Sequence, residues 1–354
     1  MNNIATGDAL EHGLETLLLT TKSRSEFSRS LMRVDVPAKI FQSPNLDSYF
    51  RYYLEQCTTA VIDTSDQTKT HRQIVNTARL LADPSTDASY ISNLLERATT
   101  SDEENDEVYW TFFAVRVLTM IDVGGLRQGI RLGLSPNIWS EGTIRDFVKA
   151  KFPAEKVLFS NGKMDPLFNA CNIDSIASIR VIWTNNIADH LILEDGDRSI
   201  KVFSHVSFLE LHRDCDIFPP GFVDETIRTL ALLLPSNDKE TRIWFYKEQK
   251  RCSNQSSIDS KAIDCRPVNS INRQFQKYNF WHDRLVMLNE AFNDPNPKSM
   301  RQLWLDRRRP AEWYSFWYAI FLIVGLTLFF GLVGSIEGGL QVYKAYHPSS
   351  SQGS

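Results

Sequence analysis

The 354-residue chain has few cysteines and no excess of positive charge. Its five cysteines are odd in number and widely spaced, which argues against a disulfide framework and indicates reduced intracellular thiols. A net charge of −4 provides no basic field, so no nucleic-acid partner is predicted. Hydrophobic residues make up 42% and charged residues 23% of the chain, so it is not a disordered protein and can bury a sizeable core.

Motifs of nucleophilic, phosphate and metal chemistry are also missing. The sequence has no Gly-x-Ser-x-Gly, no His-Glu-x-x-His, no phosphate loop and no dinucleotide fingerprint. We therefore predict no catalytic residue, no metal ligand and no cofactor, although an enzyme with an unfamiliar site stays open as an alternative. Residues 1–24 lack a basic region followed by an apolar stretch, so no secretory signal is expected.

One long apolar run stands out near the end of the chain. Residues 313–336 carry no charge over 24 positions. A bilayer core of about 30 Å needs roughly 20 helical residues, so this run is long enough to cross it. We predict a transmembrane helix at 313–337, a short tail at 338–354, and lipid as a partner. No other segment is long and apolar enough to span.

The flanking charges predict the orientation of this helix. Arg307, Arg308 and Arg309 precede it, whereas only Lys344 follows it. Basic residues favour the cytoplasmic side, so the N-terminal domain is predicted to be cytoplasmic. Few residues follow the helix, which predicts a tail-anchored protein inserted after synthesis. The endoplasmic reticulum or plasma membrane is expected rather than the mitochondrion.

Small residues mark the far end of the predicted span. Gly334 and Gly338 lie four residues apart, as do Ser335 and Gly339. Such spacing allows two helices to approach closely, so a homo-oligomer through the membrane helix is predicted. Glu337 lies among them, where a carboxylate suggests a polar partner. The alternative is a glycine-rich helix end at the membrane interface.

The remainder is predicted to be mainly α with a small antiparallel β element, an α+β soluble part. We expect a partly ordered segment at 1–45, a helical region at 46–100, an α+β cytoplasmic domain at 101–269, and amphipathic and juxtamembrane helices at 270–310. Apolar periodicity and stop signals predict helices at 47–57, 70–82, 87–97, 108–121, 125–132, 143–152, 223–234, 271–292 and 300–309.

The β element is predicted around an Asp-Gly turn. Alternating apolar residues predict a strand at 178–184, and residues 191–193 and 200–203 flank the turn at 194–197 as a hairpin. A helix, a strand and a hairpin also allow a winged-helix unit. The polar stretch 251–268 is predicted to be a loop.

Histidines supply the candidate polar residues. His205 and His212, with Asp214, Cys215 and Asp216, form the densest possible metal group, but the paired spacing of zinc ligands is missing, so polar residues at helix ends are favoured.

Two further histidines stand next to carboxylates. His190 follows Asp189, and His282 precedes Asp283, so each could be a base with an orienting carboxylate. Neighbours in sequence seldom face each other on a helix or strand, which favours structural histidines.

Three stretches resemble a family of filamentous-fungal membrane proteins. Residues 313–348 read WYSFWYAIFLIVGLTLFFGLVGSIEGGLQVYKAYHP, residues 281–286 read WHDRLV, and residues 182–191 read IWTNNIADHL. They match the C-terminal anchor and two upstream elements of that family, over about residues 105–348. The resemblance implies a single C-terminal anchor. The family has no assigned activity to carry over, and some chains with comparable tails are labelled CorA-like.

The leading hypothesis is a single-pass, C-terminally anchored protein whose cytoplasmic domain binds or scaffolds an unidentified protein partner. The alternatives are a degenerate CorA-like ion-transport component, a membrane-tethered enzyme and a membrane-tethered winged-helix regulator. The chain departs from the CorA pattern, because it has no Gly-Met-Asn triplet and one predicted span where that fold uses two.

Overall fold

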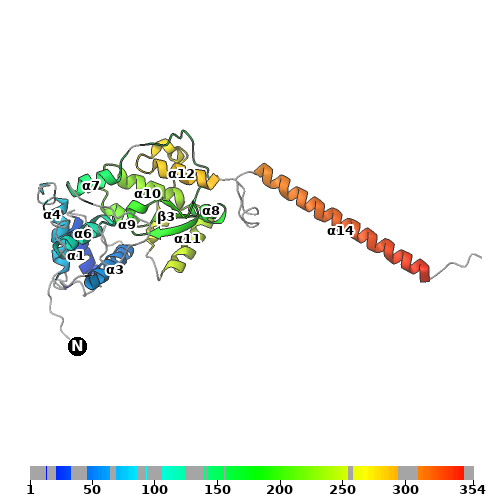
Figure 1. Ribbon diagram of the computed structural model, residues 1–354, viewed down its shortest axis with the longest axis horizontal. Helices are drawn as coiled ribbons and strands as arrows, with labels where there is room; N and C mark the ends of the chain where they lie inside the picture. Colours follow the sequence, from blue (N-terminus) through cyan, green and yellow to red (C-terminus); the bar gives the residue numbers. More distant parts are fainter. Residues whose placement is uncertain are drawn as a thin grey trace, which may run out of the picture. The chain divides into compact units, whose positions relative to one another are not determined.

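The computed structural model describes residues 13, 21–32, 46–63, 69–83, 85–86, 93, 106–123, 139, 142–154, 156–253, 258–293 and 310–346. The chain divides into two units, Met1–Pro295 and Asn296–Ser354, which we call unit 1 and unit 2 (Figure 1). The helices predicted at 125–132 and 300–309, almost all of the helix at 87–97, and the three arginines at 307–309 lie outside the described residues. The domain boundaries predicted within residues 1–310 stay predictions.

Unit 1 is mainly helical. Its described α-helices are α1 (Thr21–Met32), α3 (Asp47–Asp63), α4 (His71–Ala82), α6 (Asp106–Thr119), α7 (Ile144–Lys151), α8 (Ala170–Ser175), α9 (Val206–Leu211), α10 (Phe222–Leu233), α11 (Lys239–Cys252) and α12 (His282–Asn293). Its described 3-10 turns are η3 (Ile187–Asp189), η4 (Ser260–Asp264), η5 (Ile271–Arg273) and η6 (Phe275–Lys277). The helices predicted at 47–57, 70–82, 108–121, 143–152 and 223–234 are confirmed, and α3 continues beyond its predicted end. Helices α1, α4 and α6 pack together, and α3 contacts α6 (Figure 1).

Local capping explains where two of these helices begin. Helix α4 starts after Thr70, whose hydroxyl accepts the Gln73 N–H while the Gln73 side chain accepts the Thr70 N–H. Thr143 and Asp146 repeat this reciprocal arrangement at α7. Each pair satisfies two backbone N–H groups that a helix start otherwise leaves unpaired.

A small mixed sheet lies within unit 1. Strands β1 (Arg180–Thr184), β3 (Ser199–Phe203) and β2 (Leu193–Glu194) lie side by side in that order. Strands β2 and β3 pair antiparallel, so the predicted hairpin is confirmed. Its turn needs positive φ at three successive residues, 55° at Asp195, 62° at Gly196 and 63° at Asp197, and Asp and Gly adopt that region more readily than most residues.

Strand β1 joins the other side of β3 in parallel, which the sequence did not indicate. The chain leaves β1, passes through η3 and returns on the far side of β3 as β2. Val181 and Trp183 are buried in β1, as the alternating pattern predicted, and β3 is the most buried strand. Helix α8 contacts β1 and α11, and Figure 1 shows α8 and α11 beside the sheet.

The single helix predicted at 271–292 is wrong. The structure places η5 and η6 there, followed by α12 from His282. The backbone is extended at Gln274 and Tyr278, with ψ of 132° and 131°, so no continuous helix can form. Leu285, Leu288 and Phe292, whose apolar spacing contributed to that prediction, are nevertheless buried. Apolar periodicity thus identified buried residues within α12, but Ile271 at the start of the predicted helix is 59% exposed, and the pattern did not show where the helix begins.

The region 239–265 also differs from its prediction. Helix α11 was not predicted, because it is polar and buries only Thr241, Phe245 and Cys252. The predicted loop at 251–268 contains η4, which buries Ala262 and Ile263. A helix with so narrow a buried face gives little apolar periodicity to detect.

Aromatic side chains fill the core between α7, α10 and α12. The Trp281 ring lies 5.8 Å from the Phe152 ring, 5.5 Å from the Phe222 ring and 4.8 Å from the His190 ring, centre to centre. These residues come from four separate parts of the chain. Trp281 immediately precedes α12, so this packing fixes the first turn of that helix.

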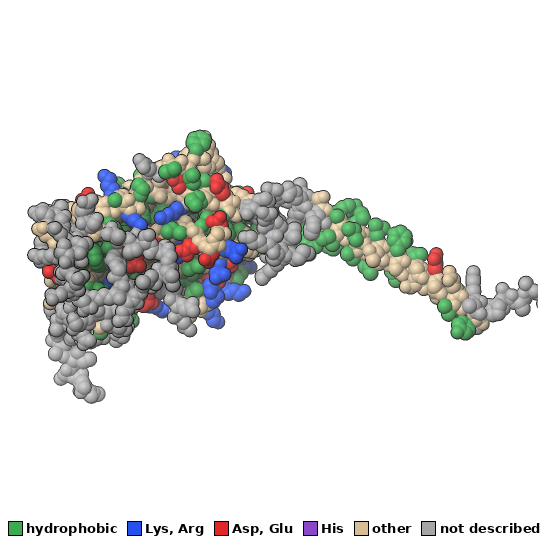
Figure 2. Space-filling view, in the orientation of Figure 1, with side chains coloured by type: hydrophobic (Ala, Val, Ile, Leu, Met, Phe, Trp, Pro, Cys, Tyr) green, Lys and Arg blue, Asp and Glu red, His purple; other side chains and the backbone are tan. Residues whose placement is uncertain are grey.

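The described residues of unit 2 form the long helix α14 (Pro310–Tyr346). Its segment Trp317–Tyr343 is long and apolar enough to cross a membrane, so the predicted apolar helix is confirmed, and α14 runs beyond the predicted end. Green apolar side chains cover much of its visible surface in Figure 2. At 1.5 Å per residue the 37-residue helix is about 55 Å long.

Candidate functional site

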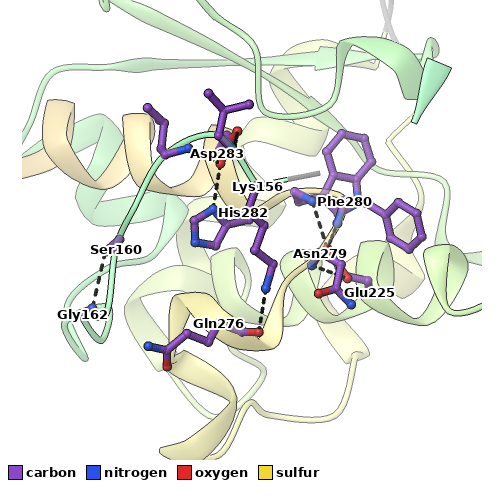
Figure 3. Close-up of polar contacts among 12 residues, drawn as sticks. Lys156, Ser160, Gly162, Glu225, Gln276, Asn279, Phe280, His282 and Asp283 are labelled. Carbon is purple, nitrogen blue, oxygen red and sulfur yellow. Dashed lines mark hydrogen bonds and ion pairs between the residues drawn. The ribbon is translucent and has the colours of Figure 1, made fainter. Parts of the chain in front are cut away.

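His282 and Asp283 form a hydrogen-bonded pair in the first turn of α12. His282 Nδ1 lies 2.7 Å from Asp283 Oδ1, and Figure 3 shows the two side chains facing each other. The expectation that sequence neighbours would not face each other is therefore wrong here. Successive helical residues diverge by about 100°, but side chains of the first turn lean toward the helix start, where no preceding turn separates them.

Asp283 also holds a loop that is distant in sequence. Its carboxylate accepts the N–H groups of Val157 at 2.9 Å and Leu158 at 3.2 Å. Partial burial raises the pKa of Asp283, but the hydrogen bonds from His282, Val157 and Leu158 outweigh it, so that pKa lies below its usual value. The carboxylate is therefore charged at neutral pH and stabilises the backbone at 157–158.

Further contacts fix residues 156–163, which we call the 156–163 loop. Lys156 Nζ donates to the Gln276 carbonyl at 3.0 Å (Figure 3). Gln276 Nε2 in turn donates to Asn161 Oδ1 at 2.6 Å. At the far end, the Phe275 N–H donates to the Gly162 carbonyl at 3.3 Å. Hydrogen bonds thus hold this loop against η6 and α12 along its length.

The 156–163 loop exposes apolar side chains to solvent. Val157 is 82% exposed and Phe159 is 88% exposed, the highest fraction of any large apolar side chain that the structure describes. Leu158 between them is also partly exposed. An ordered backbone that exposes adjacent large apolar groups is a feature of interaction surfaces.

Glu225 of α10 fixes the chain just before the pair. Its buried carboxylate accepts the N–H groups of Asn279 at 2.8 Å, Phe280 at 2.7 Å and Trp281 at 2.9 Å (Figure 3). The Trp281 indole N–H also donates to Thr226 Oγ1 at 2.8 Å. Negative charge at a helix start is favourable, so Glu225 determines where α12 begins.

His190 has a structural role. Its Nδ1 accepts the Phe203 N–H at 3.2 Å, so Nε2 carries the proton and donates to Thr229 Oγ1 at 2.7 Å. Burial, with a smaller contribution from Arg284, lowers the pKa of His190 to about 3. The ring is neutral at physiological pH and both nitrogens are occupied, which does not suit a general base.

His205 and His212 flank α9, so the structure places both at helix ends, as favoured above. His205 Nε2 lies 2.8 Å from Asn185 Oδ1, and His212 Nδ1 donates to the Phe208 carbonyl at 3.0 Å. Both rings are buried, which lowers the pKa of His205 to about 3 and that of His212 to about 4.

The candidate histidines make their hydrogen bonds to other groups rather than to one another. Their rings pack on different aromatic residues: His190 on Trp281, His205 on Phe203, His212 on Phe208 and His282 on Phe275. Asp214 and Asp216 are exposed. Within the part of the chain that the structure describes, no three His, Cys, Asp or Glu side chains gather as metal ligands do.

The sequence analysis missed Glu225 and the 156–163 loop. Glu225 resembles any acidic residue in the first turn of a helix, and only the folded chain shows its partners 54–56 residues away. The loop did leave a signal, because the apolar triplet 157–159 lies next to Ser160, Asn161 and Gly162. Such a triplet beside turn-forming residues marks an apolar loop tip.

The small residues of α14 lie open along the helix. A Cβ atom added at Gly334, Gly338 or Gly339 would meet no atom within 4 Å. The Ser335 hydroxyl donates to the Gly331 carbonyl at 2.8 Å, within the same helix. Larger residues at these glycines would therefore disturb no contact within a single chain.

Comparisons of the chain with protein families, with curated proteins and with solved structures found no match. Function is therefore inferred from the contacts and surfaces of this chain alone.

Proposed function

We propose that the protein is a single-pass membrane protein whose unit 1 faces the cytoplasm and serves as an interaction or scaffold domain. The observation that carries this proposal is α14, whose large apolar side chains are exposed along the segment Trp317–Tyr343. Exposure of so much apolar surface to water is unfavourable, whereas lipid solvates it, and a helix satisfies its own backbone groups there.

The length of α14 suits a bilayer. Its 27-residue apolar segment is about 40 Å long, which exceeds a hydrocarbon core of about 30 Å and reaches both interfaces. Tyr318 and Tyr343 lie near the two ends of that segment and are exposed. Tyrosine is favoured at membrane–water interfaces, so these residues would anchor the helix at its two ends.

Sequence charge supports the proposed orientation. Arg307, Arg308 and Arg309 precede α14, and the positive-inside rule assigns that end to the cytoplasm. The protein would be tail-anchored in the endoplasmic reticulum or plasma membrane, with unit 1 exposed to cytoplasmic partners.

The role of unit 1 is inferred from how its polar groups are used. His190, Asp283 and Glu225 all bond to backbone groups and hold loops and helix starts in place. Such groups stabilise a surface that another protein can bind. We therefore propose a protein partner for unit 1.

Two copies of α14 are proposed to pair through the face that carries Gly334, Gly338 and the adjoining Ser335 and Gly339. Side chains are small along this stripe, so two backbones can come close, and packing supplies the attraction in lipid. Glu337 would add a hydrogen bond across the pair.

The test combines membrane extraction with protease protection in sealed microsomes. We expect the full chain to resist alkaline carbonate, and external protease to remove unit 1 and leave a small protected C-terminal fragment. Replacing Arg307, Arg308 and Arg309 with glutamine should mix the orientations. Release of the chain by carbonate would contradict the anchor. Glycosylation of Asn254 in its Asn-Gln-Ser acceptor would show that unit 1 lies on the lumenal side, the opposite of the proposed orientation.

A further inference from the structure

We propose that the 156–163 loop docks unit 1 on the surface of an anionic bilayer, with Val157 and Phe159 inserted among the lipid headgroups. This inference rests on the proposed membrane anchorage and adds a second, reversible contact with lipid. The anchor alone would leave unit 1 free to tumble at the end of its connection to α14. Docking would hold one face of unit 1 toward the lipid.

The loop is built to present these side chains. Asp283 binds the N–H groups of residues 157 and 158, and Lys156 and Asn161 are both tied to Gln276. The backbone that carries Val157 and Phe159 is therefore fixed before any binding occurs. A preorganised loop loses little conformational entropy on docking, which favours binding by a small apolar surface.

Basic residues flank the apolar residues 157–159, and the Nζ atoms of Lys156 and Lys163 bond to the Gln276 carbonyl and the Ser270 hydroxyl. Lys156 and Lys163 mark the two ends of the loop, and exposed Lys277 lies beside it on η6. Exposed Asp165 and, in the sequence, Glu155 oppose these charges only in part. Asp283 is occupied by three hydrogen bonds and faces the loop backbone. Lysines around an apolar tip match a surface of anionic headgroups.

The small size of the apolar tip, residues 157–159, favours lipid over a protein as its binding partner. A stable protein interface buries about 800 Å² on each side, which needs roughly 20 residues or more. The tip supplies only residues 157–159 as apolar contacts. A few apolar side chains that enter the headgroup region are, in contrast, enough for a reversible contact with a bilayer.

The short stretch of chain between α12 and α14 allows even a weak contact with lipid to hold the 156–163 loop at the membrane. Sixteen residues separate Asn293 at the end of α12 from Pro310 at the start of α14. Even fully extended they span at most about 55 Å, at roughly 3.5 Å per residue. With α14 inserted, unit 1 cannot diffuse away, so the effective lipid concentration at the loop stays high.

The test uses the full chain reconstituted in liposomes of phosphatidylcholine with or without phosphatidylserine. A polarity-sensitive fluorophore is attached to a Ser160→Cys variant at the tip. The parent chain, treated identically, measures labelling of the five native cysteines, of which Cys57, Cys252 and Cys265 are buried. We expect headgroup-depth lipid quenchers to reduce emission at least twofold more with phosphatidylserine than without it. High salt should weaken this quenching, because it screens the lysines.

Two double variants of the labelled chain separate docking from other effects. Val157→Asp with Phe159→Asp should abolish lipid quenching, and because both side chains are exposed, the fold should persist with an unchanged unfolding temperature. Ile243→Asp with Tyr246→Asp removes two exposed apolar side chains from α11, which are 58% and 46% exposed, and should leave quenching intact.

The outcomes distinguish this inference from the anchor on which it rests. The protein could stay with the liposomes after carbonate treatment while the label at position 160 stays accessible to an aqueous quencher. That result would overturn docking but not the anchor. Lipid quenching that is equal in the parent loop and in the double variant Val157→Asp with Phe159→Asp would also overturn it. Failure of the chain to remain with the liposomes would overturn the anchor and docking together.

Discussion

The same apolar side chains occupy opposite environments in the two units. Phe222 and Trp281 of unit 1 are buried among protein atoms, whereas Phe329 and Phe330 of α14 are 59% and 65% exposed. Unit 1 removes these apolar side chains from water by packing them against one another, whereas α14 leaves its apolar side chains exposed to whatever surrounds the helix. Unit 1 thus buries large apolar side chains within itself, whereas α14 exposes them, which is the property that the proposed membrane anchor rests on.

Polar groups follow the same division. In unit 1, buried side chains such as Glu225 bond to segments far away in the chain. In α14, the hydroxyls of Thr327 and Ser335 bond to carbonyls of their own helix, both at 2.8 Å. Tertiary contacts thus stabilise unit 1, whereas these two hydroxyls of α14 are satisfied within their own helix, as the proposed membrane anchor requires.

Arginines in the middle of α14 should produce the largest effect. Each arginine near the bilayer centre costs roughly 2.5–3.5 kcal/mol of insertion free energy, so Leu326→Arg with Phe330→Arg should move the chain from the membrane to the soluble fraction. Carbonate extraction followed by flotation measures this partition. Leu80→Arg, at an exposed leucine of α4, serves as the control and should leave the chain in the membrane.

Matched phenylalanine truncations test the comparison directly. Phe222→Ala should lower the unfolding free energy of unit 1 by about 3–5 kcal/mol, because it leaves a cavity beside Phe152 and Trp281. Phe329→Ala should leave unit 1 unchanged, because its ring is exposed on α14. Urea unfolding of the reconstituted chain, followed by tryptophan fluorescence, gives both values, and equal losses would contradict the account.

Acid should destabilise unit 1 through its buried histidines. The pKa values of His190, His205 and His212 lie near 3, 3 and 4, well below the unfolded value of about 6.5. The unfolded chain therefore binds more protons below pH 6.5, and stability falls as the pH drops toward 4. Each histidine contributes a loss of about 1.4 kcal/mol between pH 7.5 and 5.5, or roughly 4 kcal/mol together.

The measurement is urea unfolding of unit 1 in the full chain at these two pH values. His190→Gln should reduce the pH-dependent loss by about one third, whatever it does to stability at pH 7.5. A stability that is independent of pH over this interval would show that the three histidines are protonated equally in both states.

Loss of the Glu225 charge should have a moderate effect on unit 1. Glu225→Gln replaces one acceptor oxygen with an NH₂ group that faces backbone donors, which should cost about 1.5–3 kcal/mol. Hydrogen exchange at the amides of residues 279–281 should accelerate accordingly. Glu290→Gln, an exposed position on α12, should change stability by less than about 0.5 kcal/mol.

Pairing of α14 should show the smallest effect. Gly334→Ile with Gly338→Ile should weaken association by about 1 kcal/mol, roughly fivefold, without reducing insertion. Gly325→Ile is the matched control, because at about 100° per residue it lies on the opposite face of α14 from Gly334 and also meets no atom within 4 Å. If the dimerisation reporter falls equally for the double variant and for Gly325→Ile, pairing through the Gly334–Gly338 face is contradicted.

Local signals account for what the sequence predicted. The apolar run of α14 needs no tertiary partner, and α4 and α7 combine apolar periodicity with capping residues. The hairpin β2–β3 was evident from Asp195 and Gly196. These elements depend on residues close together in the chain, which a sequence displays directly.

Long-range contacts account for what the sequence did not predict. Helix α12 begins at His282 because Glu225 binds the three preceding N–H groups, and the 156–163 loop is fixed by Asp283. The His282–Asp283 contact depends on the helix start that Glu225 creates. Histidines were recognised as candidates, but the neutral, buried state of His190, His205 and His212 depends on packing that no local pattern reveals.

A depth profile along α14 tests the central claim most directly. Spin labels placed singly at successive positions from 317 to 343 in the reconstituted full chain report accessibility to oxygen, which concentrates in the bilayer, and to a water-soluble nickel chelate. We expect the oxygen-to-nickel ratio to rise to one maximum near residue 330 and to fall toward both ends. A ratio that stays low throughout, or that oscillates with a period of about 3.6 residues, would contradict a spanning helix and indicate one in water or lying along a surface.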